Sequence, residues 1–174
     1  IDIAANNYVE LGAKPANSAR MDRNQGGWTR ITVHHSAERN PPDLDGSQRA
    51  SAAAVRSIQK AHVEGKETGY GDIGYHFVID PYGRVFQGRD LAWQGAHAMG
   101  ANNVQNIGVC LIGNFDEEKP SQAALDALEK LIDQMRKQHS IPRSHVLGHG
   151  DLKRTDCPVK YLEPWVKRYA HASA

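Results

Sequence analysis

The chain has 174 residues, of which 40% are hydrophobic and 24% are charged, as is typical of one globular domain. Lysine and arginine number 21 against 20 acidic residues, so the formal net charge is only +1. Because this balance provides no strong positive field to hold a polyanion, nucleic acid is not an expected partner. Apolar runs such as residues 107–113 are much shorter than the roughly 20 residues that cross a bilayer, so no membrane span is expected either.

The first expected element is an N-terminal extension. Residues 1–26 are polar and interrupted by Gly, Pro and Asn, and we expect them to lie on a domain formed by residues 27–174. Residues 28–35 alternate between polar and apolar side chains, which predicts a strand. After a loop rich in proline, Ser51 is placed to cap a helix that ends by Gly65.

The middle of the chain predicts further strands. Residues 75–79 and 84–87 flank a turn that contains Pro and Gly, which indicates an antiparallel hairpin. Residues 88–105 are too irregular for a regular element but too aromatic for a solvated linker, and we expect them to form the wall of a cleft. Residues 106–113 are continuously apolar, as in a strand that is covered on both faces.

The last third predicts two helices and a short strand. Ser121 is placed to cap a helix with apolar residues at helical spacing, and Val146 and Leu147 form a short strand. A final helix is expected to start near Pro158, which suits a first helical turn. The predicted fold class is therefore α/β, with a central mixed β-sheet flanked by about three helices.

Nine histidines are the unusual feature of the composition, and two cysteines accompany them. His34, His149 and Cys157 fall at predicted strand ends or adjoining loops. Zinc binds imidazole nitrogen and thiolate sulfur, and a catalytic zinc takes three protein ligands and leaves one position for water. The spacing alone is weak evidence, because no short motif joins His34 to His149. A single histidine is more often a hydrogen-bonded structural residue than a ligand.

Local patterns favour particular members of this set. Strand alternation places His35 on the apolar face and His34 on the polar face, so His35 is interpreted as structural. Cys157 precedes Pro158 and the expected helix, whose positive end would lower the thiol pKa and favour the thiolate. The alternative for Cys157 is a disulfide with Cys110, which lies in the most apolar strand and is interpreted as a small hydrophobic residue.

Seven segments, in order, resemble the zinc N-acetylmuramoyl-L-alanine amidases of type 2, a superfamily that includes peptidoglycan recognition proteins and bacteriophage lysozymes. They are residues 33–37 (VHHSA), 72–77 (DIGYHF), 80–84 (DPYGR), 87–89 (QGR), 106–115 (NIGVCLIGNF), 148–151 (GHGD) and 155–158 (TDCP). The resemblance runs from Trp28 to Trp165. It implies a peptidoglycan recognition protein-like fold and hydrolysis of the amide bond between N-acetylmuramic acid and L-alanine of peptidoglycan stem peptides.

The resemblance also implies roles for individual residues. His34, His149 and Cys157 match the zinc ligands of the family, and such a zinc supplies hydroxide near neutral pH by lowering the pKa of its water. Tyr75 matches the catalytic tyrosine. Because its ordinary pKa of ~10 makes it a poor base, we expect it to orient the water or donate to the developing oxyanion. Thr155, where phage members carry lysine, is expected to hydrogen-bond the intermediate.

Four further residues are expected to bind substrate. His97 matches a cleft histidine of phage relatives, and it either contacts substrate, for example by protonating the leaving amine, or has only a packing role. Trp93, Arg89 and Asn114 are expected to line a groove for sugar or peptide, although such residues are also common without ligands.

Two other functions compete with hydrolysis. One is a non-catalytic peptidoglycan-binding protein, which would not need all three ligands, and the other is a purely structural zinc site, which would not leave the fourth position open. No obligate protein partner is indicated. Because the implied substrate lies outside the cytoplasm, we expect a secreted or periplasmic protein. The chain begins with Ile1 rather than Met, so we expect a processed or excised form without its leader.

Overall fold

The computed structural model describes residues 13–37, 44–65, 69–152 and 159–173, and for Leu152 the backbone alone. Its centre is a five-stranded sheet with the order β3-β2-β4-β1-β5. The strands are β1 (Arg30–His35), β2 (Phe77–Ile79), β3 (Val85–Gln87), β4 (Asn106–Leu111) and β5 (Val146–Gly148). β1 pairs in parallel with β4 and β5, and β2 in parallel with β4, whereas β2 and β3 form an antiparallel hairpin. The mixed sheet predicted from the sequence is therefore confirmed.

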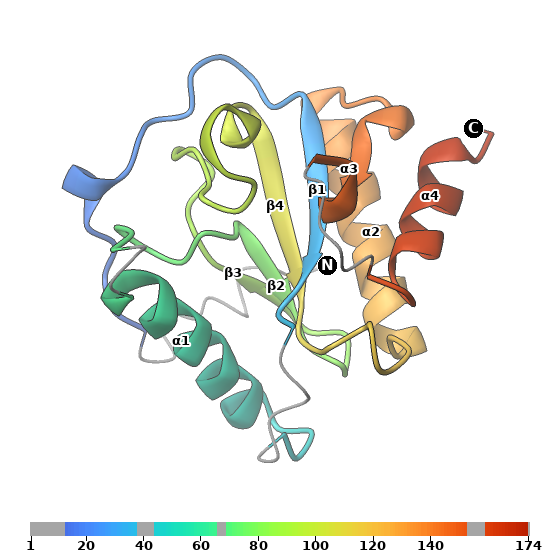
Figure 1. Cartoon of the computed structure of the whole chain (residues 1–174), viewed down its shortest axis with the longest axis horizontal. Coiled ribbons are helices and arrows are strands. Elements are labelled where there is room, and N and C mark those ends of the chain that lie inside the picture. Colours follow the sequence, from blue (N-terminus) through green and yellow to red (C-terminus); the bar gives the residue numbers. More distant parts are fainter. Residues whose placement is uncertain (1–12, 38–43, 66–68, 153–158, 174) are drawn as a thin grey trace.

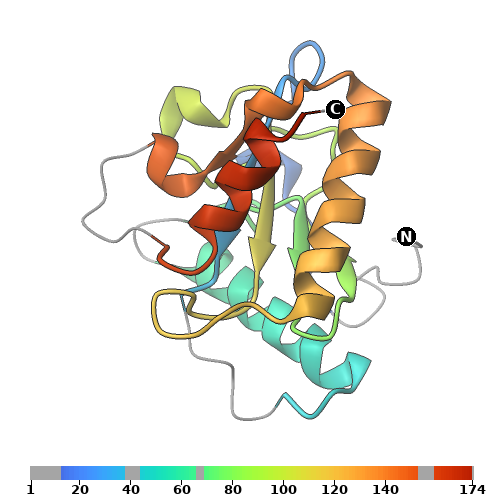
Figure 2. The same cartoon turned by 90° about the vertical axis from the view of Figure 1, so that its right-hand side faces the viewer.

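Helices cover both faces of this sheet. The described helices are α1 (Gln48–Glu64), α2 (Gln122–His139), α3 (His149–Leu152) and α4 (Glu163–His171). α1 lies on one face, and α2 and α4 lie side by side on the other (Figures 1 and 2). The sheet consequently separates two apolar clusters. The larger one includes buried residues of α2 and α4, and the smaller one includes buried residues of α1.

The ends of the helices test the predicted caps. Ser121 is the N-cap of α2, as expected, and its side chain accepts a hydrogen bond from the backbone of Ala124. The cap predicted for α1 was wrong, because Ser47 is the N-cap and accepts from the backbone of Ala50. Ser51 lies one turn further on and is buried. α1 has its C-cap at Gly65, as expected.

The C-terminal part corrects two further expectations. α3 is a single helical turn where the sequence indicated only a loop, so the described helices number four rather than three. α4 begins at Glu163, with Pro164 in its first turn, and not near Pro158. Proline suits the first helical turn because its missing N–H would have no partner there. The helix start therefore lies six residues after Cys157 in the sequence, and the predicted start near Pro158 is wrong.

The described part of the extension contacts the connection between α1 and β2 and the segment that follows β3. The backbone N–H of Asn17 donates to the carbonyl of Gly71, and Arg23 forms an isolated β-bridge with Trp93.

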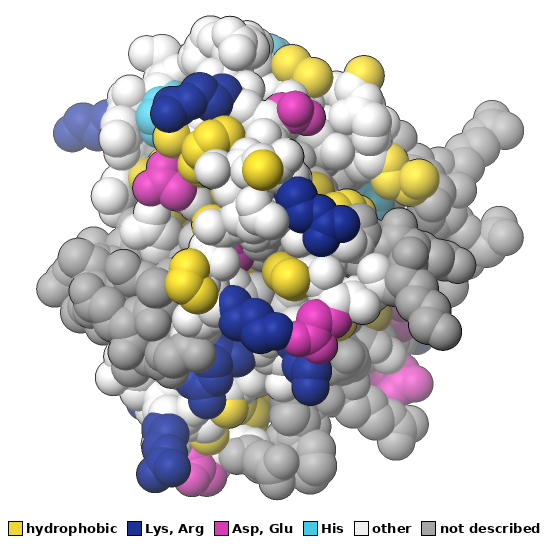
Figure 3. Space-filling view, turned by 90° about the vertical axis from the view of Figure 1, so that its left-hand side faces the viewer, with side chains coloured by type: hydrophobic (Ala, Val, Ile, Leu, Met, Phe, Trp, Pro, Cys, Tyr) yellow, Lys and Arg dark blue, Asp and Glu magenta, His cyan; other side chains and the backbone are white. Residues whose placement is uncertain are grey.

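On the face shown in Figure 3, basic side chains are interspersed with acidic and hydrophobic ones and form no continuous patch. Within the described ranges, no helix has the length and apolar character needed to cross a membrane.

Candidate metal centre

His34 lies near the C-terminal end of β1, which is an inner strand of the sheet between β4 and β5, and only 3% of it is exposed. The polar face predicted for β1 is buried inside the protein, because Thr32 on the same face is also buried. The hydroxyl of Thr32 donates to the side-chain oxygen of Asn106 on the neighbouring strand at 2.9 Å. This face is covered by the residues that precede β4, so His34 is held inside the protein.

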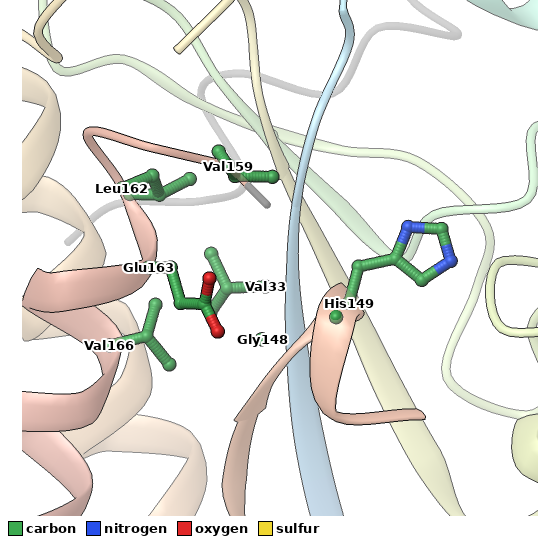
Figure 4. Close-up of a pocket in the computed structure, with 8 residues that line it drawn as sticks. Val33, Gly148, His149, Val159, Leu162, Glu163 and Val166 are labelled. Atoms are coloured by element: carbon green, nitrogen blue, oxygen red, sulfur yellow. The ribbon is translucent and has the colours of Figure 1, made fainter. Parts of the chain in front are cut away.

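His149 reaches the same place from the other side of β1. It follows β5 directly, and β5 is the parallel neighbour of β1. Because parallel strands end at the same edge of a sheet, the two histidines meet although they are far apart in sequence. Their ring centroids lie 4.6 Å apart. Figure 4 shows the His149 ring directed away from the pocket that contains the Glu163 carboxylate, so Glu163 belongs to a different environment.

The chemistry of these two residues fits a zinc ligand pair. Burial, followed by His97 and His149, lowers the pKa of His34 well below its ordinary value, so this ring is neutral at pH 7. A neutral imidazole is the form that binds a metal. Cys157 lies outside the described residues, as does Thr155. Within the described ranges no group of three His, Cys, Asp or Glu residues could hold a metal. Two of the three expected ligands, His34 and His149, do lie together there.

Tyr75 lies beside this pair, with its ring centroid 5.3 Å from that of His34. Burial, followed by the neighbouring Cys110, raises the pKa of Tyr75 well above its ordinary value, so the hydroxyl remains protonated at neutral pH. It shares a hydrogen bond with the thiol of Cys110. Because a thiol is a weak partner, this hydroxyl can be redirected to a stronger acceptor. Tyr75 is therefore a hydrogen-bond donor and not a base.

His97 also belongs to this cluster, but behind His34. Its Nδ1 lies 2.8 Å from Nε2 of His34, and its Nε2 lies 2.8 Å from the backbone oxygen of Asn106. Only 9% of the residue is exposed. Burial lowers its pKa to about 4, so the ring is neutral at pH 7. Of the two alternatives left open by the sequence, these contacts favour an internal role over contact with substrate.

Arg89 has a different environment from the one expected. It is 3% exposed, and its guanidinium donates to the backbone carbonyls of Asp72, Ile73 and Gln94 at 2.8–3.1 Å. A buried cation with three carbonyl partners ties two loops together. Arg89 also lines a pocket together with Gln94 and Asn103, so the groove-lining role stays a prediction beside this structural one.

Trp93 and Asn114 also make contacts that need no ligand. The guanidinium of Arg23 lies 5.0 Å from the ring centroid of the half-buried Trp93. The backbone oxygen of Trp93 lies 2.9 Å from Nε2 of His76. The side-chain oxygen of Asn114 accepts from the backbone N–H of Asp116, which closes a turn after β4. Trp93 also lines a pocket with Asp72 and Gln87, so its role in a groove, like that of Asn114, stays a prediction.

Sequence reasoning missed two contacts around Tyr75. Cys110 was interpreted only as a core residue, yet it is the register partner of His34 and bonds the hydroxyl of Tyr75. His62 on α1 is a second neighbour of Tyr75. Its Nδ1 accepts from the backbone of Gly74 at 2.9 Å, and its ring centroid lies 5.5 Å from that of Tyr75. The pairing of two central strands was the available signal for Cys110, because it sets their side chains next to each other.

Comparison with known proteins places this geometry in a family. The family described as N-acetylmuramoyl-L-alanine amidase matches residues 24–160. Human N-acetylmuramoyl-L-alanine amidase is 35% identical over 146 residues, which cover 83% of this chain and 24% of the human protein. The corresponding pig enzyme is 38% identical over 130 residues, covering 74% of this chain and 21% of the pig protein. The chain thus spans a quarter or less of the length of these mammalian relatives.

Solved structures are similar along almost the whole chain. Drosophila peptidoglycan recognition protein SD has a TM-score of 0.81 and 30% identity, and the match covers 96% of this chain and 95% of that one. A mutant of Drosophila peptidoglycan recognition protein LB in complex with tracheal cytotoxin has a TM-score of 0.80 and 28% identity, with coverages of 97% and 95%. The chain therefore belongs to the N-acetylmuramoyl-L-alanine amidase family and has the fold of the peptidoglycan recognition proteins.

Proposed function

We propose that this protein hydrolyses the amide bond between N-acetylmuramic acid and L-alanine of peptidoglycan stem peptides, with zinc held by His34, His149 and Cys157. The observation that carries the proposal is the convergence of two imidazoles, 4.6 Å apart between centroids, beside Tyr75. Cys157 completes the set by its match to the third ligand of the family. Addition of water across the amide yields the lactyl carboxylate and the free amino group of L-alanine.

The residues of the proposed site have different roles in the reaction. Zinc, when bound, would supply Lewis acidity and lower the pKa of a water molecule. His34 and His149 offer imidazole nitrogens at the end of a parallel strand pair, which holds the ligands in place before substrate arrives. Tyr75 keeps its proton and can donate it in a hydrogen bond to the substrate oxygen on which negative charge develops. Thr155 offers a second hydroxyl for the same purpose.

The substrate class and the location follow from the relatives. A structural neighbour holds tracheal cytotoxin, and the family description names the muramoyl-alanine bond. The near-zero net charge suits recognition by local contacts, since it gives no general attraction to a polymer of either sign. A substrate of this kind lies outside the cytoplasm, and we therefore propose a secreted or periplasmic location.

A second candidate function is peptidoglycan recognition without hydrolysis. It is favoured by the similarity to Drosophila peptidoglycan recognition protein SD along almost the whole chain. The two candidates differ in what they require of the metal ligands. A binding protein has no chemical need for two adjacent imidazoles or for a third sulfur ligand, so the adjacency of the two imidazoles favours hydrolysis.

Digestion of purified sacculi separates these functions. Incubation with the zinc-loaded protein is expected to release new L-alanine amino termini and no new sugar reducing ends. The reaction should stop on chelation and resume when zinc is restored. His149→Ala should abolish the release, whereas His171→Ala, at an exposed position at the end of α4, should not.

Two results would contradict the proposal. New reducing ends would identify a glycosidase. Binding to sacculi by the zinc-loaded protein without release of amino termini would assign the recognition function instead.

A further inference from the structure

We propose that His97 is a positioning residue of the metal centre, which orients the ring of His34 and sets the tautomer that leaves Nδ1 of His34 for the metal. The inference rests on the proposed zinc site. It gives a function to a buried histidine that sequence comparison with phage relatives suggested as a substrate contact.

The hydrogen-bond chain runs from β1 to the start of β4. Nε2 of His34 lies 2.8 Å from Nδ1 of His97, and Nε2 of His97 lies 2.8 Å from the backbone oxygen of Asn106. Both histidines are buried. Each contact has the length of a good hydrogen bond, so His97 uses both ring nitrogens within the protein.

The direction of the chain follows from the group at its end. A backbone carbonyl can only accept, so Nε2 of His97 donates to Asn106. A neutral imidazole carries one N–H, and Nδ1 of His97 is therefore an acceptor. It follows that Nε2 of His34 donates to His97. The lone pair of His34 then resides on Nδ1, and this nitrogen is the one available to a metal.

Glycines and an asparagine hold the His97 ring in one orientation. A Cβ at Gly108 would lie 2.5 Å from the Cδ2 atom of His97, and a Cβ at Gly95 would lie 2.6 Å from the same atom. The side-chain oxygen of Asn103 accepts from the backbone N–H groups of His97 and Ala98 at 2.9 and 2.7 Å. The ring therefore sits in a slot that only glycine permits, on a backbone that is itself fixed.

The choice of a histidine in this role has an electrostatic consequence. A metal-binding histidine commonly donates its second N–H to a carboxylate, a carbonyl or water, which fixes its tautomer and orientation. A carboxylate beside His34 would add a negative charge next to the metal and weaken its effect on a bound water. His97 passes the hydrogen bond on to the Asn106 carbonyl and adds no charge. It orients His34 while leaving the positive charge of the centre undiminished.

Nitrogen NMR of the metal-free, 15N-labelled protein tests the tautomer directly. Long-range 1H–15N correlations are expected to show the proton of His34 on Nε2 and the proton of His97 on Nε2. On addition of zinc, the 15N shift of Nδ1 of His34 should change to that of a metal-bound nitrogen. A proton on Nδ1 of His34, or zinc on its Nε2, would overturn the inference. Failure to bind zinc would refute the proposed function, and the tautomers of the metal-free protein would still decide this inference.

Two substitutions at His97 provide the second test, with zinc affinity measured against a competing chelator. His97→Phe keeps the ring shape but removes both nitrogens, and we expect zinc affinity to fall about 10–100-fold. His97→Gln retains one acceptor and one donor and should recover much of this loss. His171→Gln, at an exposed site, controls for binding to surface histidines. Unchanged zinc affinity in folded His97→Phe would overturn the inference.

Discussion

His34 on β1 and Cys110 on β4 are register partners in the parallel part of the sheet. Partners in neighbouring strands direct their side chains to the same face. The hydroxyl of Tyr75 is hydrogen-bonded to the thiol of Cys110, and the ring of Tyr75 lies beside His34. The pairing of β1 with β4 thus places a proposed metal ligand near the candidate oxyanion donor. It also gives Cys110 a position that an experiment can distinguish from the proposed role of Cys157.

The first prediction concerns the two cysteines. Cys157→Ser should lower zinc content to well below one ion per chain, because a hydroxyl is a much weaker zinc ligand than a thiolate. Cys110→Ser should retain one zinc, because Cys110 is buried in β4 and bonds Tyr75. Metal analysis of the two purified variants after dialysis checks this. Equal loss of zinc from both would revive the disulfide alternative.

The second prediction concerns Tyr75. Tyr75→Phe removes one donor to the developing oxyanion, and kcat should fall about 100–1,000-fold, as for the loss of one oxyanion-hole donor. Zinc content should be unchanged, because the hydroxyl is not among the proposed ligands. Initial rates on a soluble muropeptide and metal analysis of the same sample provide the measurement. A full kcat in the zinc-loaded variant would remove Tyr75 from the mechanism.

The third prediction is a loss of stability in acid that depends on His76. Nδ1 of this buried ring accepts from the backbone of Gly108, and burial lowers its pKa to about 3. In the unfolded chain the pKa of this histidine is about 6.5. As the pH falls, His76 is therefore protonated in the unfolded chain at a higher pH than in the folded protein. The contribution of His76 to the free energy of unfolding is complete above pH 6.5. It should be lost at about 1.4 kcal/mol per pH unit as the pH falls towards 3.

Urea unfolding of the metal-free protein between pH 7 and pH 4.5 checks this slope. The variant His76→Gln should be less stable at pH 7 but lose less stability per pH unit than the natural chain. Parallel pH profiles for the two proteins would mean that another group is responsible for the acid sensitivity.

The fourth prediction concerns the glycine slot around His97. A Cβ at Gly108 would lie 2.5 Å from the His97 ring, so Gly108→Ala should lower the free energy of unfolding by about 1–3 kcal/mol, as in other overpacked cores. Gly27→Ala is the matched control, because its added Cβ meets no atom within 4 Å. Urea unfolding measures both. Equal stability of the two variants would show that the slot can relax without cost.

Local sequence patterns predicted the elements whose signals are local. The alternation of residues 28–35 and the apolar run of residues 106–113 became β1 and β4, and Ser121 became the cap of α2. The start of α1 was placed one turn late, because Ser47 and Ser51 are chemically equivalent caps. Only the packing of the first turn, which buries Ser51, distinguishes them.

For the candidate site too, the sequence predicted some features and only the structure showed others. Family motifs in the sequence predicted His34 and His149, and the structure brings their rings together because β1 and β5 are parallel neighbours. Arg89 was predicted to line a groove, and it does line a pocket, but its guanidinium also binds the carbonyls of Asp72, Ile73 and Gln94. Backbone carbonyls are present at every residue, so no residue type in the sequence could identify them as its partners.

By itself, the sequence determined the type of fold and predicted a ligand set, because periodicity and motif order are properties of the chain before it folds. Only the tertiary structure decided what the buried polar side chains do. His97 illustrates the difference, since its two partners are a ring on β1 and a carbonyl at the start of β4. A hydrogen bond depends on distances of a few tenths of an ångström between segments distant in sequence, and those distances exist only after the sheet has formed.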